Sequence, residues 1–165
     1  MPSATVSVVP LHGGAGSRTV SRILNLRKGA GGMTWTEAPG VGVVPERGPA
    51  LLVARTSGIG LERAWAAARQ WGTGDMSGLH LVGLVLVADA PKPARPLTGS
   101  IRRVGRMYPR AWRIAWVPEW HLTTEPSLER IPRSVGRISA RINARATDAR
   151  AETQTSRNET KESKR

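Results

Sequence analysis

Short runs of apolar residues alternate with amphipathic segments along most of the chain. Four of these runs are aliphatic or β-branched with few polar positions, which is typical of strands that are buried on both faces. We predict strands at residues 5–9, 50–55, 79–89 and 111–117. Turn residues or a helical pattern separate each run from the next, so the strands do not follow one another directly.

Helical spacing of apolar residues marks the segments between these runs. The clearest case is residues 59–71, where one stripe carries Leu61, Ala64, Trp65, Ala68 and Trp71. Weaker helical patterns occupy residues 18–29, 97–108 and 134–145. Strands that alternate with helices predict an α/β fold in three layers, with a mostly parallel sheet of about four to five strands and flanking helices.

Two segments lack any apolar period. Residues 29–49 are rich in glycine and proline and are predicted to form a long irregular loop. Residues 147–165 are basic and polar, and we predict a disordered tail there. The expected organisation is therefore one reduced P-loop-like α/β domain over residues 1–146, followed by the tail.

Composition excludes several classes of site. The chain has no cysteine, so disulfides and cysteine-ligated zinc are absent, and its three histidines are scattered without ligand spacing. We therefore expect no metal site made by the protein alone.

The N-terminus has no signal-peptide pattern, and the longest apolar run, residues 79–88, is too short for a membrane span. A cytoplasmic protein without membrane contact is the expectation.

Charge is large and uneven. The formal net charge is +13, and residues 92–165 hold 17 Lys and Arg against seven Asp and Glu. One reading is contact with a polyanion such as nucleic acid, and the other is a solvated surface in an arginine-rich composition. Four arginines recur every four residues and predict a basic stripe on the last helix, a candidate contact for nucleic acid or an acidic partner protein: Arg133, Arg137, Arg141 and Arg145.

A glycine-rich stretch, LHGGAGSRT, follows the first predicted strand. Parallel sheets bind ligands beyond the carboxyl ends of their strands, which is where this stretch lies. Gly13, Gly14 and Gly16 allow the backbone to curl closely around a phosphate group. Successive backbone N–H groups and the helix N-terminus would then hold the anion.

This stretch resembles the deviant Walker A loop of the ParA/MinD-type P-loop ATPases, whose pattern is roughly x-K-G-G-x-G-K-S/T. Residues 51–71, 81–89 and 113–120 resemble later strands and helices of that family, and the chain also looks like short uncharacterised actinobacterial proteins with such a loop. The resemblance implies a nucleotide, ATP or another, held by the loop residues His12, Gly13, Gly14, Ala15, Gly16, Ser17, Arg18 and Thr19. It also makes Trp120 a candidate for stacking on the base, with covering of the loop as the alternative.

The loop departs from the family pattern at its charged positions. His12 stands at the signature lysine, Ser17 at the phosphate-binding lysine, and Arg18 at the hydroxyl that ligates Mg²⁺. The metal-side aspartate has no clear counterpart, although Asp89 could hold a metal-bound water or cap a turn. Without these groups little remains to stabilise phosphoryl transfer, so we assign no catalytic residue.

The tryptophans give a further set of expectations. Trp65, Trp71, Trp112 and Trp116 fall on apolar faces and are predicted to pack in the core, whereas Trp35 lies in the long loop and is expected at the surface. Three functions stay open. The first is a degenerate P-loop protein that binds a nucleotide or phosphate ligand without efficient hydrolysis and acts as a regulatory or partner-binding module. The second is a basic nucleic-acid-associated or scaffold protein with a vestigial loop. The third, and the least favoured by the residues present, is a weak residual ATPase.

Overall fold

The computed structural model describes residues 4–74 and 78–164. Its centre is a sheet of five strands, all parallel, in the order β2-β1-β3-β4-β5. The strands are β1 (Thr5–Pro10), β2 (Thr34–Glu37), β3 (Gly48–Arg55), β4 (Leu79–Val87) and β5 (Ala111–Ile114). The predicted α/β class and its parallel sheet are confirmed.

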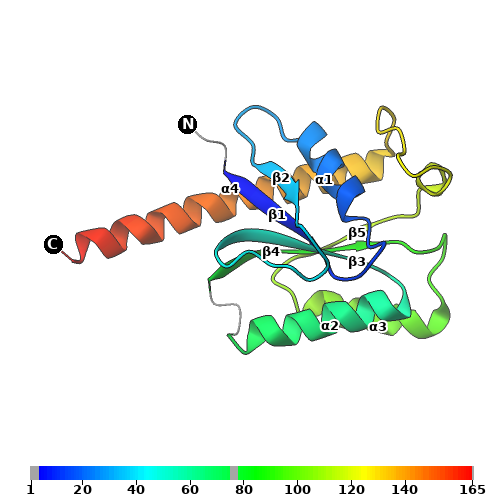
Figure 1. Cartoon of the computed structure of the whole chain (residues 1–165), viewed down its shortest axis with the longest axis horizontal. Coiled ribbons are helices and arrows are strands. Elements are labelled where there is room, and N and C mark those ends of the chain that lie inside the picture. Colours follow the sequence, from blue (N-terminus) through cyan, green and yellow to red (C-terminus); the bar gives the residue numbers. More distant parts are fainter. Residues whose placement is uncertain (1–3, 75–77, 165) are drawn as a thin grey trace.

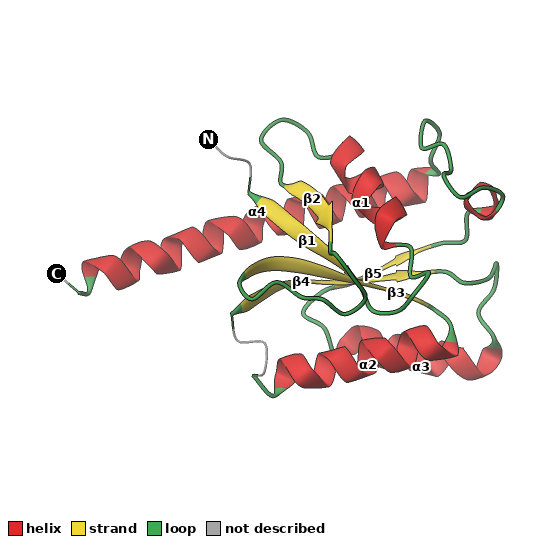
Figure 2. Ribbon diagram, in the orientation of Figure 1, coloured by secondary structure: helices red, strands yellow, loops and turns green. Residues whose placement is uncertain are grey.

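Helices cover both faces of the sheet and give the molecule three layers (Figure 1). Helices α1 (Ser17–Leu26) and α4 (Arg133–Glu162) lie on one face, and α2 (Gly58–Gly72) and α3 (Arg95–Arg106) lie on the other (Figure 2). Because crossovers between parallel strands are right-handed, the helices change face where the chain reverses its direction across the sheet. This reversal falls between β1 and β3, where doubly wound sheets open a crevice for ligands.

Two apolar clusters, one on each face, make the core. The α1/α4 side contains Val8, Ile23 and Ile142, and the α2/α3 side contains Leu52 and Leu84, all of them buried. Strands β3 and β4 contribute to both clusters, as their nearly unbroken apolar sequence predicts. The central strands are thus held from both faces, and their carboxyl ends are fixed relative to each other.

The predicted irregular loop at residues 29–49 is wrong in its middle, because β2 lies within it and pairs with β1. Trp35, expected at the surface, is only 2% exposed. Its indole Nε1–H donates to Asn143 Oδ1 of α4 over 2.8 Å, and the amide of Asn25 bonds both backbone groups of Trp35. Side chains from two helices therefore fix a strand that is too short to be read from its own sequence.

Helix α4 contradicts the predicted disordered tail and the domain boundary at residue 146. The helix runs without interruption to Glu162, and Ala146 and Ala149 are buried against the rest of the molecule. Past this point its side chains are mostly exposed, and several hydroxyls, such as that of Thr160, bond the carbonyl four residues earlier. No helix in residues 4–74 or 78–164 is long and apolar enough to cross a membrane.

The four tryptophans predicted to be core residues behave differently. Trp71 and Trp112 are half-buried and pack against the two clusters. Trp65 is 46% exposed, so its prediction is wrong, and the guanidinium of Arg69 lies 4.8 Å from its ring centroid. Trp116 is half-buried and stacks on His121. The apolar stripe of α2 is wider than the part of the helix that packs on the sheet, so Trp65 at its margin stays in solvent.

Candidate functional site

The glycine-rich stretch forms one wall of a pocket of about 520 Å³ at the reversal point of the sheet. The opposite wall comes from the end of β2 and from residues 38–41, and Arg55 at the end of β3 closes one side. Every predicted loop residue lines it: His12, Gly13, Gly14, Ala15, Gly16, Ser17, Arg18 and Thr19. The sequence therefore located a real hollow, in the place where parallel sheets bind ligands.

Backbone conformation explains the glycines. Gly14 and Gly16 have φ angles of 73° and 94°, in the left-handed region that residues with a Cβ rarely adopt. Gly16 is the N-cap of α1, and none of the side chains that the structure describes caps this helix. The N–H groups of the first turn of α1 are therefore available to an acceptor in the pocket.

His12 has a structural role. The residue is 9% exposed, and its Nε2 accepts a hydrogen bond of 2.9 Å from the backbone N–H of Arg55. Because Nε2 accepts, Nδ1 carries the proton and donates to the carbonyl of Gly13 at 2.9 Å. The imidazole thus ties the loop to β3, and no cation replaces the signature lysine at this position.

Ser17 is also engaged. Its hydroxyl, 4% exposed as a residue, donates to Glu37 Oε1 at 2.7 Å. Glu37 is the last residue of β2, the strand beside β1, and it lines the pocket. The pocket therefore contains a carboxylate, although the sequence showed no counterpart of the metal-side aspartate. Sequence reasoning missed Glu37 because a four-residue strand between glycine-rich segments gives no clear pattern.

Arg55 is the second pocket residue that the sequence did not single out. Its Nε–H donates to the carbonyl of Gly14 at 2.6 Å, and its Nη1 donates to the carbonyl of Ala88 at 3.3 Å. Its Nη2 lies 3.8 Å from the point that a Cβ on Gly16 would occupy. The guanidinium therefore places a positive charge along the loop, contributed by the neighbouring strand.

Arg18 and Thr19 line the outer part of the pocket. Arg18 forms an exposed ion pair with Glu125, a residue of the segment between the 3-10 helix (Pro118–His121) and α4. This pair holds the start of α1 against that segment. Exposed pairs of this kind contribute little to stability, so Arg18 can exchange Glu125 for another anion.

Trp120 does not lie in the pocket. It is half-buried against the α1/α4 cluster and lines a separate hollow of about 360 Å³ with Val117 and Pro126. The structure therefore does not bring the expected base-stacking residue to the glycine loop. The resemblance put Trp120 directly after the last strand of the sheet. In the structure that strand, β5, ends at Ile114, and Trp120 lies six residues later in the 3-10 helix.

The carboxyl ends of β3 and β4 carry a second group of polar side chains. The exposed His121 ring stacks on Trp116 with centroids 3.7 Å apart. Partial burial and the positive charge of Arg55 lower the pKa of His121 below its ordinary value, and Asp89 opposes this shift. The backbone N–H of Asp89 is held by Thr56 Oγ1, and its carboxylate is exposed. Asp89 follows β4, and β3 lies between β4 and β1, so Asp89 does not line the glycine-loop pocket.

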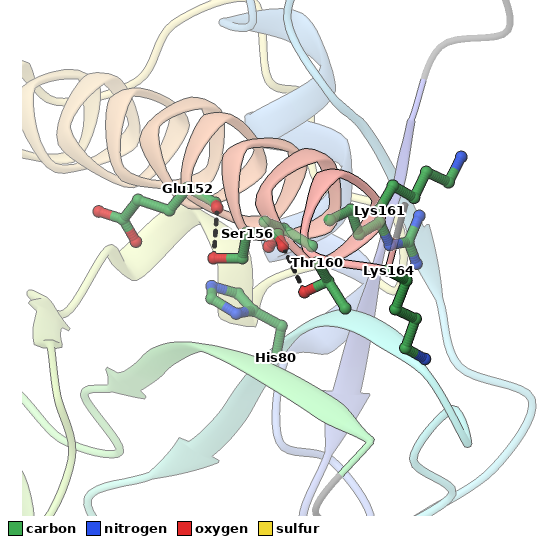
Figure 3. A pocket seen from close by; sticks show the side chains of 8 residues that line it. His80, Glu152, Ser156, Thr160, Lys161 and Lys164 are labelled. Atoms are coloured by element: carbon green, nitrogen blue, oxygen red, sulfur yellow. Dashed lines mark hydrogen bonds between the residues drawn. The ribbon is translucent and has the colours of Figure 1, made fainter.

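A larger hollow, about 860 Å³, lies between the C-terminal half of α4 and His80 of β4 (Figure 3). The hydroxyls of Ser156 and Thr160 bond carbonyls of their own helix there. Its walls are one projecting helix and one histidine, so it does not gather groups from several elements. Within the described residues, no group of three His, Asp or Glu is placed to hold a metal ion.

The predicted arginine stripe on α4 is only partly present. Arg133, Arg137 and Arg141 are exposed. Arg145 is turned toward the molecule, with 25% of its side chain exposed, and pairs with Glu152 at 3.3 Å. Positions four apart on a helix rotate by about 40° per step, so a stripe of four does not stay on one face.

Neither the curated proteins nor the solved structures contain a match to this chain. A family model covers residues 4–138, which include all five strands and the whole glycine-loop pocket. The chain therefore belongs to the family described as a family of unknown function, DUF6668.

Proposed function

We propose that this protein binds a phosphate-bearing ligand of the nucleotide class in the glycine-loop pocket, and holds it without efficient hydrolysis as a regulatory or partner-binding module. The observation that carries the proposal is the hydrogen bond from Arg55 Nε to the carbonyl of Gly14. It places a guanidinium beside the uncapped N-terminus of α1, and both favour an anion in the same hollow.

Glu37 sets a condition on this binding. Its carboxylate lines the pocket and would repel a phosphate group that enters alone. Ser17 Oγ and Glu37 Oε1, 2.7 Å apart, are oxygen ligands of the kind that Mg²⁺ prefers. We therefore expect the ligand to bind as its Mg²⁺ complex, with these two side chains near the cation and phosphate oxygens completing its coordination.

Efficient phosphoryl transfer does not fit the residues present. No lysine is among the described residues that line the pocket, and both ring nitrogens of His12 are already hydrogen-bonded to backbone groups of the loop and β3. Two backbone carbonyls already accept from the Arg55 guanidinium, which limits its freedom to follow charge that develops in a transition state. Binding makes smaller demands than catalysis, because the charge to be held does not change during the event.

Calorimetric titration of the full chain with ATP, ADP and GTP, each with and without Mg²⁺, tests the proposal. Gly13 is the position to alter, because a Cβ there meets nothing within 4 Å and its φ is not left-handed. Gly13→Asp adds a negative charge to the loop and is expected to remove saturable binding, whereas Gly13→Ala is expected to keep it.

A charge control separates the pocket from general attraction to a basic protein. Ala140→Asp introduces the same charge on an exposed position of α4 and is expected to bind like the unmodified protein. Equal weakening in Gly13→Asp and Ala140→Asp would contradict the proposal. So would the absence of saturable binding at millimolar ligand, which would leave the loop a tight turn between β1 and α1.

A further inference from the structure

A basic surface lies at the opposite edge of the sheet from β2. Residues 90–118 contain seven Lys and Arg and no Asp or Glu. All seven cationic side chains are exposed. Four of them line a groove of about 440 Å³ between α3 and the edge strand β5, and we call these four the α3–β5 surface: Arg102, Arg106, Arg110 and Arg113.

The four arginines come from different parts of the chain and converge. Arg102 and Arg106 lie one turn apart on α3, Arg110 lies in the connection, and Arg113 lies on β5. Over the described ranges, no carboxylate comes within 4.0 Å of any of them, and the two ion pairs found there involve Arg18 and Arg145. The surface therefore holds its charges without internal compensation.

Structural explanations cover single members of this set. Arg106, in the last turn of α3, interacts favourably with the negative end of the helix dipole. Arg113, on an edge strand, discourages the addition of a foreign strand. Neither reason requires Arg102 and Arg110 to line the same groove, where like charges repel one another. A bound polyanion would relieve that repulsion.

The arginines of α4 make a useful contrast. Arg133, Arg137 and Arg141 are equally exposed, but Arg145, the next in their series, is paired with Glu152. They also lie along one helix and line none of the hollows described above. Exposed charge on a single helix has an ordinary explanation as a solvated face, whereas a groove lined from α3, the connection and β5 does not.

We infer that the α3–β5 surface binds nucleic acid through its phosphate backbone, without reading sequence. Arginine guanidinium groups bind phosphates in a bidentate manner, and four of them line this one groove. Strands β3 and β4 separate β1 from β5, so this surface and the glycine-loop pocket are distinct. The inference does not depend on the proposed nucleotide binding.

Fluorescence anisotropy with a short labelled DNA duplex of random sequence tests the inference on the full chain. Two variants remove the same number of charges: Arg106→Gln, Arg110→Gln, Arg113→Gln in one, and Arg133→Gln, Arg137→Gln, Arg141→Gln in the other. All six side chains are exposed, and urea unfolding verifies that both variants stay folded. Titrations are made between about 50 and 200 mM salt, a range over which binding through several phosphate contacts weakens by orders of magnitude.

The expected result is a loss of at least about tenfold in affinity for the α3–β5 variant at low salt, with a slope of log affinity against log salt that flattens by about 2 to 3. The α4 variant is expected to stay within about twofold of the unmodified protein, since it removes no phosphate contact. Equal losses in the two variants would overturn the inference and leave only general attraction. Failure of the unmodified protein to bind DNA at low salt would overturn it too.

Polyglutamate of matched charge provides the remaining comparison. An acidic protein partner would use the same arginines, so polyglutamate that displaces DNA at equal charge concentration would favour such a partner and overturn the assignment to nucleic acid. Displacement only at a large excess supports it, because the spacing of a phosphate backbone then contributes to binding beyond charge alone.

Discussion

Arg55 Nε donates a hydrogen bond of 2.6 Å to the carbonyl oxygen of Gly14, and the Arg55 backbone N–H donates to His12 Nε2. One residue at the end of β3 therefore holds the glycine loop from two directions. The loop is bound to its neighbouring strand before any ligand arrives. This arrangement makes the shape of the pocket depend on Arg55 as much as on the glycines.

Replacement of Arg55 by lysine is expected to destabilise the protein although the charge is kept. An ammonium group cannot reproduce the fork that reaches both Gly14 and Ala88. A lost hydrogen bond to a charged group corresponds to about 1.5–3 kcal/mol in the free energy of unfolding, measurable by urea denaturation. Arg63→Lys, at an exposed position of α2, is the control and should change stability little. Similar effects at both positions would mean that the Gly14 contact contributes nothing.

His121 provides a pH test of the same cluster. Partial burial and Arg55 hold the pKa of His121 below its ordinary value of 6.5, and Asp89 acts in the opposite direction. The lowered pKa means that the folded state binds this proton less readily than the unfolded chain, so its contribution to stability is present above the unfolded pKa and is lost as the pH falls. Proton NMR titration should place the midpoint of His121 below 6.5.

Substitutions at the two charged neighbours should move this midpoint in opposite directions. Arg55→Gln is expected to raise the pKa of His121, and Asp89→Asn is expected to lower it further. A midpoint that ignores both substitutions would show that Arg55 and Asp89 do not share the electrostatic environment of His121.

The central part of the fold could be predicted because its signal is local. Strands β1, β3 and β4 are mostly apolar runs, and α2 carries a long apolar stripe, so period and length identified them directly. The loop was identified for a similar reason, since three glycines within four residues closely follow a predicted strand in the sequence. These elements also predicted that the pocket lies beyond the carboxyl ends of the strands.

The remainder depends on contacts between distant residues. Strand β2 is held by Asn25 and Asn143, which lie 10 and 108 residues from Trp35 in the chain. The part of α4 around residue 146 packs through two buried alanines, Ala146 and Ala149. Alanine is too small to give a clear apolar period in a polar sequence. Glu37 and Arg55 reach the pocket only through the order of the strands, and strand order cannot be read from periodicity.

The bond between Trp35 and Asn143 should couple β2 to α4 energetically. Trp35→Phe removes the Nε1–H donor and leaves Asn143 Oδ1 without that partner. A double-mutant cycle with Asn143→Ala is expected to give a coupling of about 1 kcal/mol in urea unfolding. Trp65→Phe, at a residue that is 46% exposed, is the matched control and should change stability far less. Additive effects of the two core substitutions would show that the bond does not link the elements.

Glu37 gives the sharpest test of how the pocket would hold its ligand. Glu37→Gln keeps the shape of the side chain and an acceptor for the Ser17 hydroxyl but removes the negative charge. Without Mg²⁺, the variant should bind ATP more tightly than the unmodified protein, because repulsion between carboxylate and phosphate is gone. Addition of Mg²⁺ should raise the affinity of the variant for ATP only a little, because one oxygen ligand of the cation has lost its charge.

The two titrations are informative together. The unmodified protein should gain at least about tenfold in affinity from Mg²⁺, which corresponds to about 1.4 kcal/mol, and Glu37→Gln should lose most of that gain. Thr36→Val, at the exposed preceding residue of β2, controls for disturbance of the strand. Equal dependence on Mg²⁺ in all three proteins would show that Glu37 does not act through a cation, and its bond to Ser17 would then serve only to join β2 to the start of α1.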